Sequence, residues 1–411
     1  MKNVVGFENK KYGLLGEHLP HSFSPLIHSY FAHYPYELYE VQRDKLEKWV
    51  KNNDLAGYNV TIPYKAEIMK YCDELSDTAK KIGAVNTVLK RADGTLFGDN
   101  TDYFGFSCMI AKLGIDLRGK KAVVLGSGGA SKTVQTVLSE QGAKVVVIFR
   151  QGDDNYDNIQ KHKDAVLIVN ATPVGMYPDC PKSPVDLKVF ESLQAVCDLI
   201  YNPAKTALLM QAESMGIKTS NGLLMLVAQA KRAVEIFRSV EINDGLIDNF
   251  TAKIADRVLN IVLIGMPGCG KSTVGKILSE ITGRAFADSD EEIFKKTGKT
   301  PAQIIENFGV EEFRNIETEV LKELSKESGR ILATGGGAVT VSENYPLLVQ
   351  NSKIVFIERD LSLLATEGRP LSQNLSKLYE ERLPLYKAFA DAVVDGNRDA
   401  RAVAEDIIEV F

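Results

Sequence analysis

Continuous apolar runs alternate with helical patterns over much of the chain, which predicts an α/β architecture. The run Lys121–Gly126 is followed by a glycine-rich turn, a helical pattern over Lys132–Gln141 and a second apolar run, Lys144–Phe149. A strand, a helix and a strand in this order form a βαβ unit with parallel strands. Two further apolar runs, Ala165–Val169 and Ala195–Ile200, are expected to extend the same sheet.

A second series of predicted strands begins late in the chain. Its apolar runs are Ile261–Ile264, Ile331–Thr334 and Lys353–Ile357, and helical patterns separate them. Residues 221–257 are mostly helical by periodicity, and this helical region leads directly into the first of these strands. We therefore expect a domain boundary near residue 258 without a long flexible linker.

The first hundred residues mix short apolar runs with helical patterns. The segment Asp44–Val50 has the pattern of an amphipathic helix. Ala56–Pro63 is typical of a buried strand that leads into a turn, because proline cannot donate a ladder hydrogen bond. The chain shows no internal repeat and no low-complexity tract.

Composition narrows the class of partner. The 411 residues suffice for two to four domains, and a net charge of −5 argues against nucleic acid or an anionic membrane as the main partner. No apolar run is long enough to span a membrane, and the N-terminus has no signal-peptide pattern. Five cysteines without a C-x-x-C pair favour the reducing cytoplasm over a disulfide framework or a zinc site. Small-molecule substrates are the expected partners, and a homodimer is left open.

The segment Gly265–Ser272 has the spacing G-x-x-x-x-G-K-S and follows an apolar strand. In that context the backbone N–H groups wrap phosphates, Lys271 places its charge on them and the Ser272 hydroxyl ligates Mg²⁺. The sequence therefore predicts a site for a nucleoside triphosphate. The expected nucleotide-binding residues are Gly268, Cys269, Gly270, Lys271, Ser272 and Thr273.

Two carboxylates follow this motif. Phe286–Asp290 is expected to be a short strand, in which the side chains of Asp288 and Asp290 share one face. One carboxylate would serve the metal, while the other would accept hydrogen bonds from a hydroxyl substrate. The alternative is a solvated acidic turn or a helix N-cap.

Further motifs in the last third of the chain make the pattern specific. They are Phe308–Arg314, the triple glycine in Ala333–Ala338, Glu367–Leu371 and Arg382–Tyr386. Their order and spacing resemble those of shikimate kinase over essentially all of residues 259–411. The resemblance implies a parallel-sheet P-loop domain that uses ATP and Mg²⁺.

The resemblance to shikimate kinase also implies individual roles. Shikimate would be held by Asp290, Arg314, Gly336, Gly337 and Arg382, with the two arginines on its carboxylate. Asp288 and Ser272 would hold Mg²⁺. Asp290 would orient or deprotonate the attacking hydroxyl, and Lys271 would act on the phosphates. Arg369, the single arginine of a short lid segment, would bind ATP and reach the transferring phosphoryl group.

The glycine turn Gly126–Ser131 follows a strand and precedes a helix, as in dinucleotide-binding folds. By itself it is a weak signal, because it lacks the full G-x-G-x-x-G pattern. The second strand of that unit ends at Arg150, where an NAD-binding protein would place an acidic residue. An arginine there suits the 2′-phosphate of NADP, although it is also a common surface residue.

Several motifs of the first half form an ordered set. They are His21–Pro25, Asn59–Lys65, Ala84–Thr87, Gly98–Asp102, Asn170–Met176, Asp198–Pro203 and Asn221–Gln229. Each has a structural explanation when taken alone, but together they resemble shikimate dehydrogenase across residues 5–255. The resemblance implies a two-lobed α/β enzyme with an NADP-binding Rossmann-type lobe.

By this second resemblance, Lys65 and Asp102 form a catalytic pair. The implied substrate-binding residues are Ser22, Ser24, Asn59, Thr61, Asn86, Thr101, Tyr201 and Gln229. The implied NADP-binding residues are Gly126, Ser127, Gly128, Gly129, Ala130, Arg150, Thr172, Met176 and Gly222. Reduction of a ketone needs a hydride on carbon and a proton on oxygen, and a lysine beside a carboxylate can deliver that proton.

The sequence thus predicts a fused bifunctional enzyme. Residues 1–102 with 223–257 would form a substrate lobe, 103–222 an NADP lobe and 258–411 a kinase domain. It would reduce 3-dehydroshikimate with NADPH and phosphorylate shikimate with ATP. Two alternatives stay open: a quinate-type dehydrogenase fused to a different small-molecule kinase, and a nucleotide-sensing regulatory protein with inactive sites.

Overall fold

The computed structural model describes residues 10–19, 22–178, 180–364 and 375–410. Its contacts divide the chain into two compact units. The first unit comprises residues 1–174, 183–201 and 208–254, and the second comprises 175–182, 202–207 and 255–411. Across the described ranges, none of the helices combines the length and the apolar character needed to cross a membrane.

The first unit begins with a mixed six-stranded sheet in the order β2-β1-β3-β5-β6-β4. Strand β1 is parallel to its neighbours β2 and β3, whereas β5 is antiparallel to β3 and β6. The strands are β1 (Tyr12–Gly16), β2 (Tyr36–Glu40), β3 (Gly57–Val60), β4 (Glu74–Leu75), β5 (Thr87–Lys90) and β6 (Leu96–Asp99). The predicted buried strand is confirmed as β3, and the predicted amphipathic helix as α2 (Leu46–Asn52).

Helices cover both faces of this sheet. On one face, Leu46 and Val50 of α2 and Ala79 of α3 (Asp77–Ile82) join a buried cluster with the strands. On the other face, Tyr12 of β1 stacks on Phe237 of α7 (Gly222–Arg238), with 4.8 Å between ring centroids. Helix α1 (Ser24–Phe31) also packs against α7. A helix from beyond residue 222 therefore completes the core around the first sheet.

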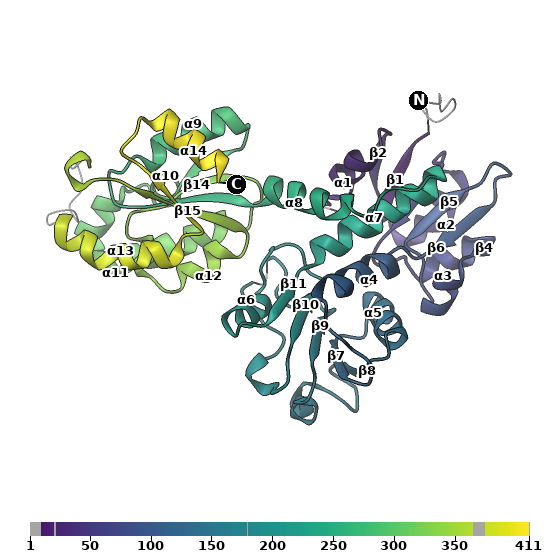
Figure 1. Cartoon of the computed structure of the whole chain (residues 1–411). Coiled ribbons are helices and arrows are strands. Elements are labelled where there is room, and N and C mark those ends of the chain that lie inside the picture. The colour runs from purple at the N-terminus through teal and green to yellow at the C-terminus, as the bar shows by residue number, and fades with distance from the viewer. Residues whose placement is uncertain (1–9, 20–21, 179, 365–374, 411) are drawn as a thin grey trace. The chain divides into compact units, whose positions relative to one another are not determined.

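The second sheet of the first unit is entirely parallel, in the order β11-β10-β9-β7-β8. Its strands are β7 (Lys121–Leu125), β8 (Lys144–Ile148), β9 (Leu167–Asn170), β10 (Ala195–Asp198) and β11 (Lys218–Ser220). Figure 1 shows α5 (Gly129–Glu140) and α6 (Ala207–Ser214) on opposite sides of it. The predicted βαβ unit and the two further strands are confirmed. Helix α5 begins at Gly129, three residues before the predicted start, so it starts inside the glycine turn.

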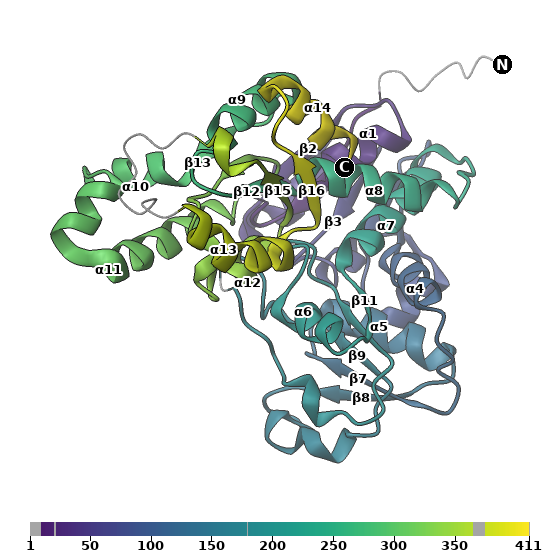
Figure 2. The ribbon, with the colours of Figure 1, turned by 60° about the vertical axis from the view of Figure 1, so that its left-hand side comes forward.

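The second unit holds a parallel sheet in the order β13-β14-β12-β15-β16. Its strands are β12 (Asn260–Ile264), β13 (Phe286–Asp288), β14 (Ile331–Ala333), β15 (Ser352–Glu358) and β16 (Ala392–Asp395). Helices α9 (Lys271–Thr282) and α14 (Ala400–Glu409) lie over one face, and α12 (Asn344–Val349) and α13 (Leu375–Phe389) over the other (Figures 1 and 2). Helices α10 (Ser289–Thr297) and α11 (Pro301–Leu324) connect β13 to β14.

The three predicted strands of this late series are confirmed as β12, β14 and β15. One residue separates the end of helix α8 (Leu246–Val258) from β12, so the predicted passage from helix to strand without a linker is also confirmed.

Candidate active sites

The predicted catalytic pair of the first unit forms an ion pair. Lys65 lies in the turn after β3, and Asp102 is the first residue of α4 (Asp102–Leu113). The distance from Lys65 Nζ to Asp102 Oδ2 is 2.6 Å, and the two side chains are 22% and 10% exposed. The Lys65 side chain is held beside a carboxylate and stays accessible enough to donate a hydrogen bond to a ligand oxygen.

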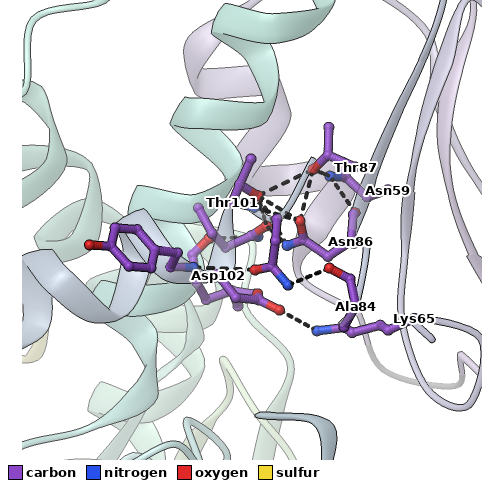
Figure 3. A network of polar contacts seen from close by, with 11 residues as sticks. Asn59, Lys65, Ala84, Asn86, Thr87, Thr101 and Asp102 are labelled. Atoms are coloured by element: carbon purple, nitrogen blue, oxygen red, sulfur yellow. Dashed lines mark hydrogen bonds and ion pairs between the residues drawn. The ribbon is translucent and has the colours of Figure 1, made fainter. Parts of the chain in front are cut away.

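Four of the predicted substrate-binding residues belong to one hydrogen-bonded network next to this pair (Figure 3). Thr101 N donates to Asn86 Oδ1 over 2.7 Å, and Asn86 Nδ2 donates to Thr101 Oγ1 over 3.0 Å. Gln229 Oε1, from α7, accepts from the Thr101 hydroxyl over 3.3 Å. Asn59 Nδ2 donates to Thr87 Oγ1 over 3.0 Å, and that hydroxyl lies 3.2 Å from Thr101 Oγ1. Strand β3, strand β5 and helix α7 therefore meet at this network.

Sequence reasoning missed two residues that support this network. The Thr87 hydroxyl joins Asn59, Asn86 and Thr101. Asn100 donates to Ala84 O over 2.9 Å and accepts from Tyr103 N over 3.3 Å, which fixes the start of α4 beside Asp102. Both residues lie inside motifs that the sequence analysis quoted. Their position next to predicted site residues was the available signal.

An aromatic layer lies behind Asn59. The Tyr36 hydroxyl donates to Asn59 Oδ1 over 2.8 Å. His28 of α1 stacks on the Tyr36 ring with 3.9 Å between centroids, and its Nδ1 lies 2.7 Å from the Tyr34 hydroxyl. Burial lowers the pKa of His28 to about 3, and the neighbouring Asn59 side chain partly opposes that shift. A neutral histidine therefore supports the residues that position Asn59.

Four further substrate-binding residues were predicted, and three of them, Ser22, Ser24 and Tyr201, form a second group. Ser24 N donates to Ser22 Oγ over 3.2 Å at the start of α1. Between these serines, Phe23 packs against Tyr201 with 5.5 Å between ring centroids. Thr61 follows β3, and its N–H donates to Leu15 O over 2.9 Å. The structure thus places Tyr201 beside the serine segment, and Thr61 four residues before Lys65.

The glycine turn at the start of α5 has room for a ligand. Gly126 has φ +99°, and a Cβ there would lie 2.8 Å from Thr172 Cγ2. A Cβ on Gly128 or Gly129 would meet nothing within 4 Å. Ser127 is exposed and Ala130 lies in the first turn of the helix. Unfilled space at a helix N-terminus fits the pyrophosphate of a dinucleotide.

The other predicted NADP-binding residues differ in exposure and in the contacts that they make. Arg150 is exposed just after β8, and the Thr172 hydroxyl donates to Asn170 Oδ1 over 2.7 Å. A Cβ on Gly222 would overlap Leu199 O, so this glycine allows close packing within the protein. Met176 is 45% exposed and belongs to the segment 175–182, which is part of the second unit.

The predicted kinase residues surround one cavity of about 690 Å³ in the second unit. It is lined by Gly268, Gly270, Lys271, Ser272, Thr273, Asp288, Asp290, Arg314, Gly336, Gly337 and Arg382, among others. Lys271 Nζ donates to Gly265 O and Met266 O over 2.9 and 3.0 Å. Cys269 is buried, and its Sγ lies 3.7 Å from the same ammonium group. Arg369 lies outside the described residues.

The predicted strand geometry of the two carboxylates is wrong. Strand β13 ends at Asp288, and Asp290 lies in the first turn of α10. Asp288 Oδ1 accepts from Asp290 N over 2.9 Å as the N-cap, because the chain enters the helix at Ser289. Both carboxylates nevertheless line the cavity. The N-cap alternative is therefore correct for Asp288.

The same aspartate meets the P-loop serine. Ser272 Oγ donates to Asp288 Oδ2 over 2.5 Å. The Ser272 hydroxyl, in the first turn of α9, thus lies beside the Asp288 carboxylate at the end of β13. Two adjacent oxygen ligands suit a hard cation such as Mg²⁺. The residues present therefore fit the predicted metal.

The two predicted substrate arginines pack on the triple-glycine segment. Arg382 Nη1 donates to Gly336 O over 3.0 Å. A Cβ on Gly337 would overlap the guanidinium group of Arg314, so only glycine allows this approach. Both arginines therefore lie on the same wall of the cavity, where they can meet one carboxylate ligand.

Sequence reasoning also missed Glu317, a fully buried residue of this cavity. Arg314 Nη1 lies 2.5 Å from Glu317 Oε2. Burial raises the pKa of Glu317, and the neighbouring Arg314 opposes that shift. Its position three residues after Arg314 in a predicted helix was the available signal, since such residues are neighbours on a helix.

The fold and the two sites define a class: an α/β oxidoreductase of the Rossmann type, joined to a P-loop kinase of a small molecule. The family models agree with this class. Residues 14–88 match the shikimate dehydrogenase substrate binding domain, and residues 267–411 match shikimate kinase.

Relatives of known identity cover the first part of the chain. Shikimate dehydrogenase (NADP(+)) of Clostridium beijerinckii is 39% identical over 256 residues, which are 57% of this chain and 94% of that protein. The crystal structure of shikimate dehydrogenase 1 from Peptoclostridium difficile is 40% identical with a TM-score of 0.56, over 60% of this chain and 97% of that one. Shikimate 5-dehydrogenase from Thermus thermophilus, solved with NADP(H) and shikimate, is 32% identical with a TM-score of 0.54, over 59% and 99%.

The chain belongs to the shikimate dehydrogenase family and carries a shikimate kinase domain after it. Both resemblances found in the sequence are thereby confirmed, as is the predicted α/β fold class.

Proposed function

We propose that this chain reduces 3-dehydroshikimate to shikimate with NADPH and then phosphorylates shikimate with ATP to shikimate 3-phosphate. The protein is a bifunctional enzyme of the shikimate pathway. The direction of the first reaction and the role of each residue are parts of the proposal. One observation carries it. A single chain holds a Lys65–Asp102 pair beside a network of amides and hydroxyls, and a P-loop cavity in which Arg314 and Arg382 lie against Gly336 and Gly337 (the glycine wall).

In the dehydrogenase reaction, bound NADPH supplies the hydride to the substrate carbonyl carbon. Lys65 donates a hydrogen bond and then a proton to the carbonyl oxygen, so that the ketone becomes an alcohol. Asp102 holds the ammonium group in place at 2.6 Å. Asn59, Asn86, Thr101 and Gln229 would bind the hydroxyl groups of the substrate, and Ser22, Ser24, Thr61 and Tyr201 would complete the site.

The Rossmann-type lobe would hold the dinucleotide. Its pyrophosphate would lie at the start of α5, over Gly128 and Gly129, and Arg150 would meet the 2′-phosphate. Use of NADP agrees with the relatives named above. We retain the division into residues 1–102 with 223–257, 103–222 and 258–411, which the three separate sheets support.

In the kinase reaction, ATP with Mg²⁺ supplies the phosphoryl group. Ser272 and Asp288 would hold the metal, and Lys271 would act on the phosphates. Asp290 would accept a hydrogen bond from the attacking hydroxyl and take its proton. Arg314 and Arg382 would bind the shikimate carboxylate from the glycine wall.

Comparison of shikimate with quinate as substrates tests the first activity. The purified chain with NADP⁺ should oxidise shikimate with a kcat/KM well above that for quinate. A clear preference for quinate would support the alternative of a quinate-type enzyme and overturn the assignment. Absence of turnover on both would support a regulatory protein with inactive sites.

We also place the enzyme in the cytoplasm, on the basis of its cysteine usage. The oligomeric state is open, and sedimentation velocity at micromolar concentration distinguishes a monomer from a homodimer.

A further inference from the structure

Arg359 has a fixed place between two loops at the carboxyl edge of the third sheet. It follows β15, whose neighbours are β12, which leads into the P-loop (residues 265–272), and β16. Gly396 N donates to Glu358 O over 2.7 Å, and Asp360 N donates to Asn397 Oδ1 over 2.9 Å. These bonds on both sides hold the backbone of Arg359.

The side chain of Arg359 lines the cavity that holds the P-loop residues. Its Nη1 lies 3.5 Å from the position of a Cβ on Gly270, the residue before the P-loop lysine. Its Nε is buried and has no hydrogen-bond partner within the described part of the chain. A buried guanidinium nitrogen without an acceptor is costly, so an acceptor on a bound ligand would account for this placement.

The other basic groups of the cavity have different neighbours. Arg314 is paired with Glu317, and Arg382 donates to Gly336 O, so both belong to the glycine wall. Lys271 donates to two carbonyl groups of its own loop. Arg359 is the arginine that flanks the P-loop in the described cavity lining, where phosphate groups of a nucleotide would lie.

We propose that Arg359 binds the polyphosphate of the nucleotide in the kinase reaction. This inference rests on the proposed kinase function and adds a phosphate ligand that the P-loop pattern does not contain. A guanidinium group matches phosphate oxygens with two parallel hydrogen bonds and retains its charge at every physiological pH.

Nucleotide titrations of the full chain test the proposal. Arg359→Ala and Arg359→Gln are titrated by calorimetry with ATP, ADP and AMP in the presence of Mg²⁺, without an acceptor. We expect about a tenfold weaker Kd for ATP and ADP and less than a twofold change for AMP, because AMP lacks the β- and γ-phosphates. The matched control is Arg401→Ala, an arginine of α14 whose side chain is 68% exposed.

An equal loss of affinity for AMP, ADP and ATP would place Arg359 on the base or ribose and overturn the proposal. Unchanged affinities for all three would overturn it as well. Arg359→Gln keeps most of the side-chain volume, so a loss seen with Ala alone would indicate packing and would also count against a phosphate contact. Shikimate phosphorylation by the unmodified chain is measured separately, so failure of the kinase assignment is distinguishable from failure of this inference.

Discussion

The two active sites use opposite kinds of polar group. The dehydrogenase network consists of neutral amides and hydroxyls that are hydrogen-bonded to one another, with the Lys65–Asp102 pair at its edge. Seven charged side chains line the described part of the kinase cavity: Lys271, Asp288, Asp290, Arg314, Glu317, Arg359 and Arg382.

This difference follows from the chemistry of each site. The hydroxyl groups and the carboxylate of the dehydrogenase substrate can be positioned by neutral hydrogen-bond donors, and only the proton that goes to the carbonyl oxygen needs a charged donor. Transfer of a phosphoryl group depends on neutralisation of the negative charge of the nucleotide by the metal ion and by basic side chains. Each substitution should therefore affect one reaction only. The loss of activity should be largest where the substitution removes a charge.

The largest effect is expected for Lys65→Ala. Loss of the proton donor should reduce kcat/KM for 3-dehydroshikimate about a thousandfold, while phosphorylation of shikimate stays within twofold. Both rates are measured on the same preparation, by NADPH absorbance and by release of ADP. Lys70→Ala, a lysine with a 58% exposed side chain, is the control. Equal loss of both activities would contradict separate sites.

The converse substitution is Lys271→Ala. We expect at least about a hundredfold loss of kinase turnover, because the loop loses the charge that it places beside the phosphates. Reduction of 3-dehydroshikimate should continue at the normal rate. Lys276→Ala on the same helix, with a 59% exposed side chain, should leave both rates unchanged. A full kinase rate in Lys271→Ala would exclude the assigned role.

A smaller and more selective effect is expected for Gly337→Ala. The new methyl group would overlap the guanidinium group of Arg314 and displace it. The KM for shikimate should rise about tenfold, and the KM for ATP should stay unchanged, since Arg314 lies on the glycine wall. A rise in the KM for ATP alone would show that this wall does not bind the acceptor.

The neutral network is tested by Thr101→Val. This nearly isosteric change removes a hydroxyl that bonds with Asn86, Thr87 and Gln229. The KM for 3-dehydroshikimate should rise about tenfold, since unsatisfied buried partners remain. Thr136→Val, on α5 outside the network, is the control. If the two variants behave alike, the network does not bind the substrate.

The smallest effect on activity, and a distinct effect on stability, is expected from His28. Its pKa is lowered to about 3 by burial, whereas the unfolded chain has a value of about 6.5. Only the unfolded state therefore takes up a proton as the pH falls below 6.5. The free energy of unfolding of this lobe should decrease by about 2 kcal/mol between pH 6.5 and 5.

Urea unfolding at each pH measures this slope. Trp49 is the single tryptophan of the chain and packs edge-on against Tyr58 in the same sheet region, so its fluorescence reports on this lobe. His28→Gln should remove the slope, and His33→Gln, an exposed histidine, should preserve it. A slope that persists in His28→Gln would assign the titration to another group.

Local patterns predicted the elements well wherever one periodicity dominated. The apolar runs of β7, β12 and β15 are buried strands whose hydrogen-bond neighbours lie far away in the chain. The antiparallel orientation of β5 could not be predicted, because it depends on which strand β5 pairs with in the folded sheet. Asp290 shows another limit of local patterns. The strand was predicted to reach Asp290, but it ends at Asp288, which caps the helix that contains Asp290.

The sequence motifs predicted residues that the structure brings together in the kinase cavity and in the dehydrogenase network. They did not predict the neighbouring residues that hold these side chains in place. Glu317 and Thr87 have no chemistry that distinguishes them in the sequence. Their importance comes from a buried ion pair and a shared hydroxyl, which exist only when distant segments meet. Arg359 likewise has no distinguishing chemistry in the sequence, and its place beside the P-loop arises because β15 ends next to that loop in the fold.

One measurement tests the central claim most directly. The purified chain is incubated with 3-dehydroshikimate, NADPH, ATP and Mg²⁺, while NADPH loss and shikimate 3-phosphate formation are followed together. We predict that both proceed and reach the same molar amount once the intermediate shikimate is consumed. NADPH oxidation without any phosphorylated product would contradict a chain that performs both reactions. So would an absence of NADPH oxidation with 3-dehydroshikimate while shikimate, added in a separate assay, is phosphorylated.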